Sequence, residues 1–230
     1  MDRRGPACED DAGGAREVDL AHFEIGPDPA QWRALYPLFI GFVNPRPIAL
    51  VSTIDAAGNT NLAPFSFYNM VSALPPVVVF GPGLRADGTP KDTLRNLQEN
   101  GEFVIATVTE AIVSRVVACA TELPHDESEF AWSGLTPVPA TRVAPPLVAE
   151  SPVNMECKVR QILRFGSGPG AGNAVFGDIQ VVHVDEAILD AKGRVEPLKL
   201  RTVGRLGGKW YSTVLSPYEL EIPRPDPPPR

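Results

Sequence analysis

Cysteine and histidine are scarce in this chain, and acidic residues outnumber basic ones. The three cysteines, Cys8, Cys119 and Cys157, show no metal-ligand spacing, and their odd number argues against a disulfide framework. We therefore expect a reducing, cytoplasmic setting and no metal site. The formal net charge of -7 disfavours binding to nucleic acid or to a membrane surface, because both need basic patches.

Long apolar runs and common nucleotide-binding or hydrolase motifs are also missing. No stretch reaches the roughly 18 apolar residues of a membrane span, and the N-terminus lacks the apolar core of a secretion signal. The Gly-rich segment 166–172 has the wrong spacing for a dinucleotide loop and precedes a predicted strand, so we interpret it as a hairpin loop. No Gly-x-Ser-x-Gly element predicts a hydrolase nucleophile.

Proline, in contrast, is abundant, with 25 residues in a chain of 230. Many of them lie in turns and near the ends, which favours a β-rich fold over a helical bundle. Residues 1–17 are rich in Gly, Asp and Arg and predict a disordered tail, and residues 222–230 predict a second, Pro-rich tail. Residues 18–221 are expected to form a single domain.

Six apolar or alternating segments predict strands at 47–54, 60–67, 77–80, 103–108, 153–163 and 174–184. Helices are predicted at 29–36, 89–101 and 110–120; the clearest is 89–101, with Thr89 as cap, Pro90 as first residue and Gly101 as stop. Strands joined by hairpins predict a mainly β fold with peripheral helices, an antiparallel barrel rather than a doubly wound sheet.

Three sequence features together suit the binding of a planar heterocycle that carries a phosphate. Ser52 and Thr53 place two hydroxyls at a predicted strand end. Segment 63–69 combines small, aromatic and amide residues that suit a planar ring. Segment 91–93, Lys-Asp-Thr, lies in the first turn of a predicted helix, where free N–H groups and the helix dipole favour an anion.

These features recur in order in segments that resemble the flavin reductase-like family. The segments are 44–53 (NPRPIALVST), 61–69 (NLAPFSFYN) and 91–94 (KDTL). Later agreement comes from Glu129-Phe130 with Gly134-Leu135, from segment 154–157, and from segment 204–208 with Tyr211. The resemblance spans about residues 36–214 and is strongest to the flavoredoxin branch.

The resemblance implies an antiparallel split β-barrel homodimer that binds FMN near the subunit interface. It places five residues around the phosphate and ribityl chain, namely Ser52, Thr53, Lys91, Asp92 and Thr93. It places four residues along the isoalloxazine ring, namely Ala63, Ser66, Phe67 and Asn69. Arg46 is expected to neutralise phosphate charge, and Arg205 and Tyr211 are expected to close the site.

The implied activity is hydride transfer from NADH or NADPH to FMN, with no catalytic side chain because the flavin carries the chemistry. Reduced FMN would then pass electrons to oxygen, to a partner monooxygenase or to another acceptor. Two alternatives stay open: an FMN-holding electron carrier without nicotinamide activity, and an FMN-dependent oxidase or oxygenase acting on a small organic substrate. The same fold hosts several chemistries, so the acceptor and the nicotinamide are left open.

Overall fold

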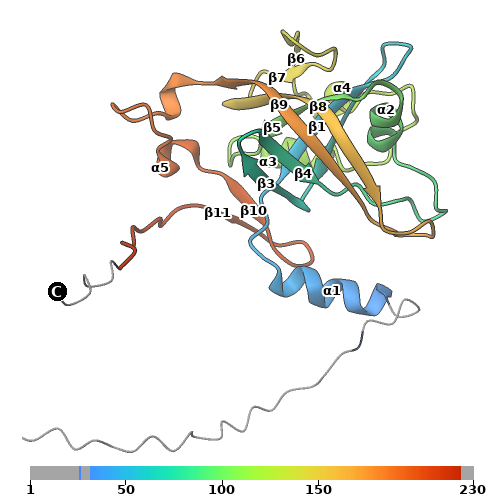
Figure 1. The fold of residues 1–230 in the computed structure, drawn as a ribbon, viewed down its shortest axis with the longest axis horizontal. Helices are drawn as coiled ribbons and strands as arrows, with labels where there is room; N and C mark the ends of the chain where they lie inside the picture. Colours follow the sequence, from blue (N-terminus) through green and yellow to red (C-terminus); the bar gives the residue numbers. More distant parts are fainter. Residues whose placement is uncertain (1–25, 27–31, 224–230) are drawn as a thin grey trace, which may run out of the picture.

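The computed structural model describes residue 26 and residues 32–223, and a seven-stranded sheet that curls into a split barrel forms its centre (Figure 1). The strands are β1 (Ala49–Ile54), β2 (Thr60–Phe65), β3 (Tyr68–Ala73), β4 (Pro76–Phe80), β5 (Glu102–Thr107), β8 (Val153–Arg164) and β9 (Asn173–Val184). They follow the order β2-β1-β5-β8-β9-β4-β3, and each pairing is antiparallel. The predicted mainly β fold is confirmed.

Short helices and two small sheets surround this barrel. The helices are α1 (Trp32–Phe42), α2 (Asp92–Asn100), α3 (Val113–Ala118), α4 (Glu129–Ser133), α5 (Pro197–Leu200) and the 3-10 helix η2 (Glu186–Ile188). The small sheets pair β6 (Pro137–Val138) with β7 (Leu147–Val148), and β10 (Val203–Arg205) with β11 (Tyr211–Thr213). Figure 1 shows that α1 lies outside the barrel, beside the hairpin of β10 and β11.

The strand β1 is buried on both faces, which explains its unbroken apolar sequence. Ala49 and Val51 belong to a core cluster that includes Phe80 and Phe103. Leu50 belongs to a second cluster, on the other face of the sheet. Successive side chains of a strand point to opposite faces, so the two clusters divide β1 between them.

The start of α2 differs from the prediction that Thr89 caps the helix and Pro90 is its first residue. Thr89 instead donates its amide N–H and its hydroxyl to the Asp87 carboxylate, at 2.8 and 2.6 Å. The cap is Lys91, in an extended conformation. A side chain that forms a local turn competes with helix capping. The predicted stop at Gly101 is confirmed, because its φ of 71° suits glycine.

The predicted helix 110–120 is present but shorter, as α3. Ile112, Val116 and Cys119 are buried, whereas Val117 is 44% exposed. Val117 therefore lies off the buried face of α3. The buried residues are spaced by four and then three positions, which is one face of a helix.

The predicted helix 29–36 corresponds to α1, which extends to Phe42. Its predicted start at Pro29 lies outside the described residues. The predicted tail 1–17 and residues 224–230 of the Pro-rich tail also lie outside them.

A sharp turn after β2 produces a strand that the sequence did not predict. The predicted strand 60–67 ends at Phe65, and after Ser66 and Phe67 the chain returns as β3. The amide of Gly81 donates to the carbonyl of Phe67 at 2.7 Å and fixes this turn. β3 is an edge strand with mostly exposed side chains, so it lacks the apolar alternation that marks a half-buried strand. Both turn residues, Ser66 and Phe67, line a cleft at this end of the barrel.

The carboxylate of Glu156, on β8, anchors the loop between β6 and β7 to the barrel. It is wholly buried and accepts hydrogen bonds from the amides of Thr141, Arg142 and Val143 and from the Thr141 hydroxyl. Its Oε1 also lies 2.6 Å from Nε2 of His183. Burial alone would raise the pKa of Glu156, but the bonds from His183 and the loop lower it to about 2.

We expect the free energy of unfolding to fall as the pH drops from about 4.5 toward about 2. The folded-state pKa of Glu156 is depressed, so its contribution is complete above the ordinary value of 4.5 and is lost as the folded carboxylate takes up a proton. Denaturant titrations at several pH values measure this slope. Glu156→Gln should flatten it in this window, and an equally steep slope in the variant would contradict the assignment.

Candidate functional site

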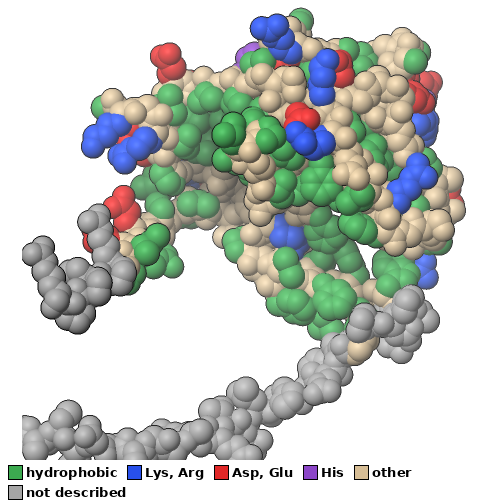
Figure 2. Space-filling model, in the orientation of Figure 1, with side chains coloured by type: hydrophobic (Ala, Val, Ile, Leu, Met, Phe, Trp, Pro, Cys, Tyr) green, Lys and Arg blue, Asp and Glu red, His purple; other side chains and the backbone are tan. Residues whose placement is uncertain are grey.

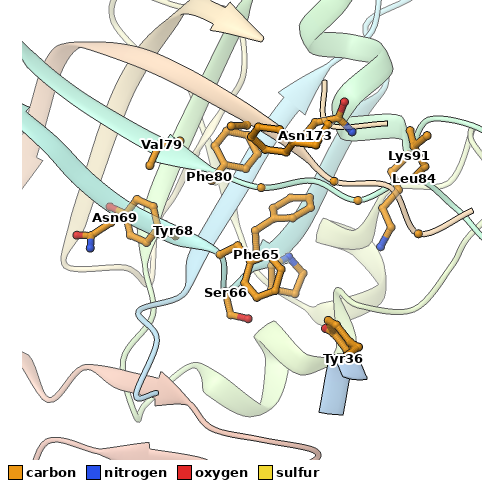
Figure 3. A pocket seen from close by; sticks show the side chains of 18 of the residues that line it. Tyr36, Phe65, Ser66, Tyr68, Asn69, Val79, Phe80, Leu84, Lys91 and Asn173 are labelled. Atoms are coloured by element: carbon orange, nitrogen blue, oxygen red, sulfur yellow. The ribbon is translucent and has the colours of Figure 1, made fainter. Parts of the chain in front are cut away.

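A cleft of about 740 Å³ opens between the turn that joins β2 to β3, the end of β4, the loop that joins β8 to β9, and α1. Aromatic side chains dominate its walls, and the set comprises Trp32, Tyr36, Phe65, Phe67, Tyr68, Phe80 and Phe165. Figure 3 shows Phe65 near the middle of the lining side chains, with Phe80 on one side of it and Tyr36, from α1, on the other. Ligand pockets of about 300–1,000 Å³ with mostly apolar walls are typical of organic cofactors and substrates.

Lys91 brings a positive charge to this aromatic cleft. In Figure 3 its side chain points into the space on the side of Tyr36. Lys91 lines both the cleft and a small adjoining pocket at the start of α2, which Thr93 and Asn61 also line. The first amide groups of a helix have no partner within the helix, and the dipole there favours an anion. The aromatic cleft therefore adjoins a helix start that offers Lys91 and free N–H groups, beside the acids Asp92, Glu122 and Glu129.

Asn61 ties the start of α2 to β1, and sequence reasoning did not assign it a separate role. Its side-chain amide donates to the hydroxyls of Thr93 (2.9 Å) and Thr53 (3.3 Å). The amide of Asn96 also donates to the Thr53 hydroxyl, at 3.1 Å. This network holds Thr93, and with it the first turn of α2, against the barrel.

Ser52 and Thr53 do not lie where the prediction needs them. Both are fully buried, and neither lines the cleft or the pocket at α2. The Ser52 hydroxyl has no hydrogen-bond partner among the described residues. The predicted direct contact with phosphate does not fit this placement, because β1 is covered by core on both faces. The Thr53 hydroxyl instead accepts hydrogen bonds from Asn61 and Asn96 and so helps to hold α2 against the barrel.

Asp92 lies among basic side chains that hold its carboxylate in place. Its carboxylate pairs with Arg85 and with Arg95 (2.8 Å), and its Oδ1 lies 2.8 Å from Nδ1 of His125. Burial raises the pKa of Asp92, but the hydrogen bond and charge of Arg85 outweigh burial and hold the pKa below its ordinary value. Asp92 thus stays ionised and fixes the loop that carries His125.

Glu129 is a buried acid on the floor of the same pocket. Its Oε2 accepts a hydrogen bond from the amide of Leu62 at 2.8 Å. Burial raises the pKa of Glu129. The sequence placed Glu129 in a matching segment without a role, and only the fold shows that it joins α4 to β2.

A third pocket, of about 180 Å³, contains Arg46, Arg205 and Tyr211. Ser66 and Tyr36 line both this pocket and the aromatic cleft, so the two spaces adjoin. Arg205 donates to the hydroxyl of Tyr211 and lies 4.4 Å above the centre of its ring. The structure therefore brings these three predicted residues together, in a pocket that Lys91 does not line.

The remaining predicted residues lie along the groove. Phe67 and Asn69 line the aromatic cleft, with Ser66 at its junction with the arginine pocket. Ala63 lines the pocket at α2. The predicted site is thus one groove along β2 and its turn, with Ser52 and Thr53 buried beneath it.

A split barrel whose aromatic cleft ends on a lysine and a helix N-terminus suits a planar ligand with an anionic end. The family model described as a flavin reductase like domain matches residues 42–199. A curated relative, an uncharacterised protein from Halalkalibacterium halodurans, is 42% identical over 201 residues, covering 87% of this chain and 96% of the relative. This chain belongs to the flavin reductase-like family, and the resemblance in its sequence is confirmed.

Two solved structures illustrate the likeness. Component B of nitrilotriacetate monooxygenase from Bacillus cereus superposes with a TM-score of 0.82 at 32% identity, covering 87% of this chain and 100% of that chain. The flavoredoxin of Desulfovibrio vulgaris (Miyazaki F) superposes with a TM-score of 0.67 at 26% identity, covering 77% of this chain and 91% of that chain. Within the part of this chain that the structure describes, none of the helices is both long and apolar enough to cross a membrane.

Proposed function

We propose that this chain is an FMN-dependent oxidoreductase that takes electrons from NADH or NADPH. One observation carries the proposal: the aromatic cleft and the pocket at the start of α2 meet at Lys91. FMN combines a planar ring system with a phosphate, and the two halves of the groove offer a wall for the first and donors for the second. The donor set of this groove therefore fits FMN.

Each group of residues has a stated task in this proposal. Lys91, Thr93 and the free amides of α2 bind the phosphate, while Asp92 holds Arg85 and His125 beside them. The turn after β2, with Ser66 and the aromatic side chains, orients the ring and excludes water. When bound, the flavin supplies the hydride and electron chemistry, so no side chain has to act as the nucleophile or proton donor.

The electron acceptor is proposed as oxygen or a partner monooxygenase. The likeness to a component B of nitrilotriacetate monooxygenase supports a partner of that kind. The likeness to a flavoredoxin supports the second candidate, an electron carrier that keeps its FMN and does not react with nicotinamide. An FMN-dependent oxidase or oxygenase would need a small organic substrate in the same cleft.

We also propose a homodimer, because the described residues expose many large apolar side chains outside the barrel. Phe39 and Phe42 on α1 are 45% and 68% exposed, and Leu74 and Trp210 are 93% and 74% exposed. Figure 2 shows hydrophobic side chains gathered over α1 and on the part of the barrel that faces it, with a hollow between. Extended apolar surface of this kind marks interaction sites.

Replacing both Lys91 and Thr93 by alanine is expected to weaken FMN binding about 10- to 100-fold. The double variant removes a cation and a hydroxyl from the phosphate end but leaves the aromatic cleft intact. Fluorescence quenching of FMN on titration with protein measures the dissociation constant. Lys199→Ala is the matched control, since Lys199 is exposed on α5 and pairs only with Glu196 among charged groups of the described chain. Unchanged FMN affinity in a folded double variant would contradict the assignment of Lys91 and Thr93 to the phosphate.

Nicotinamide consumption decides between the two candidate functions. The protein is mixed with FMN and with either NADH or NADPH, and the loss of nicotinamide absorbance is followed in air. A reductase consumes one of the two at a rate proportional to protein concentration. Bound FMN without consumption of either nicotinamide favours the electron carrier, and failure to bind FMN contradicts both.

A further inference from the structure

Arg46 and Arg205 lie directly opposite each other across a backbone bridge. The amide of Arg46 donates to the carbonyl of Arg205 at 2.9 Å, and the amide of Arg205 donates back to Arg46 at 2.8 Å. Residues opposed in this way project their side chains to the same side, where like charges destabilise the pair. Both side chains line the arginine pocket.

Neither guanidinium has an acidic partner among the residues that the structure describes. Arg46 is only 7% exposed and donates to the carbonyls of Ile40 and Val43, to the carbonyl of Leu206 at 3.0 Å, and more weakly to the Ser66 hydroxyl. Burial lowers the pKa of Arg46, and although Tyr36 raises it, the charge of Arg205 adds to the lowering. Arg205 donates to the Tyr211 hydroxyl and the Gly208 carbonyl. The hydrogen bonds orient the two side chains, but two positive charges stay uncompensated.

An uncompensated, desolvated charge is costly, and Arg46 is buried while Arg205 beside it is half-buried, so the pair favours binding of an anion. The remaining walls of the pocket are apolar and include Ile40, Ile48, Val116 and Val117. A small apolar space with guanidinium and phenol donors matches an organic carboxylate, because arginine binds a carboxylate through paired charge-assisted hydrogen bonds. The shared lining by Tyr36 and Ser66 lets a ligand reach from this pocket into the aromatic cleft.

We propose that Arg46 and Arg205 form an anion subsite for the carboxylate of an organic co-substrate whose body lies in the aromatic cleft. Arg46 is held by the backbone and supplies a fixed charge, and Arg205 supplies the donors, oriented by the ring and hydroxyl of Tyr211. Lys91 lines the aromatic cleft and the pocket at α2 but not the arginine pocket, so we assign the subsite to a second anion and not to the FMN phosphate. Its role beside a flavin rests on the proposed function, whereas anion binding itself does not.

Equilibrium dialysis of the full-length protein with three probes of matched shape tests the subsite. Benzoate is expected to bind more tightly than neutral benzamide, and Arg205→Gln should weaken benzoate about tenfold or more while leaving benzamide unchanged. Lys209→Gln removes the same charge from an exposed position four residues away and should change neither. Phenyl phosphate distinguishes a phosphate source from a carboxylate source.

Equal binding of benzoate and benzamide to the unaltered protein overturns the proposal. Benzoate affinity that is unchanged in Arg205→Gln overturns it too. Tighter, Arg205-dependent binding of phenyl phosphate overturns the carboxylate assignment. If Arg205→Gln does not fold, Tyr211→Phe decides instead: weaker benzoate binding supports the subsite and unchanged binding contradicts it. FMN affinity is measured separately, so protein that binds benzoate but takes up no FMN refutes the proposed function and leaves the anion subsite standing.

Discussion

Glu156→Ala is expected to lower the free energy of unfolding by about 3–5 kcal/mol. The substitution removes a buried carboxylate and leaves the loop amides of Thr141, Arg142 and Val143 without their acceptor. Buried donors without partners lose their hydration and gain nothing in return. A loss of this size is a large fraction of the stability of a typical domain. Urea denaturation followed by circular dichroism measures it.

Two further variants identify the cause of that loss. Glu156→Gln keeps the volume and one acceptor oxygen, so it should cost less than the alanine variant. Glu99→Ala changes an exposed glutamate on α2 and should stay within about 0.5 kcal/mol of the unaltered protein. Equal stability of Glu156→Ala and Glu99→Ala would show that the loop is not anchored by this carboxylate.

Gly177→Ala is expected to cost about 3 kcal/mol, because the barrel interior has no room for a methyl group at this position. A Cβ on Gly177 would lie 2.2 Å from Cζ of Phe103, whose ring is fully buried. Phe103 packs against Phe80, with ring centres 5.4 Å apart, and Phe80 lines the aromatic cleft. The variant should therefore lower the melting temperature and also weaken ligand binding in the cleft.

The contact with Phe103 is tested by a second-site change. Phe103→Leu in the Gly177→Ala background makes space for the new methyl and should recover part of the lost stability, although Phe103→Leu alone destabilises. Gly168→Ala is the control for glycine replacement itself, since a Cβ there meets no atom within 4 Å. Purely additive losses in the double variant would exclude the proposed clash.

The groove along β2 was largely predictable because its residues are close together in the sequence. Ala63, Ser66 and Phe67 lie within one strand and the turn that follows it, and Asn69 is only two residues further on, at the start of β3. Lys91 and Thr93 were predictable from helix-start chemistry, although the helix begins at Asp92 and not at Pro90. The error arose because Thr89 binds Asp87, a contact that competes with capping.

Burial and long-range pairing were beyond the reach of the sequence. Ser52 and Thr53 have the hydroxyls that a phosphate site needs, but both faces of β1 are covered by core clusters, so the hydroxyls are enclosed. The opposition of Arg46 to Arg205 joins residues 159 positions apart (205 − 46) through an isolated backbone bridge. A local pattern carries no signal for such a contact.

The sequence alone determined the class of fold, the aromatic segment after β2 and the lysine at a helix start. Each of these depends on neighbouring residues and on their periodicity. The tertiary structure alone decided which polar groups reach the cleft and which lie in the core. It also decided that two arginines share one pocket. The physical reason is that solvent exposure and charge compensation depend on what packs against a side chain, and those partners come from distant parts of the chain.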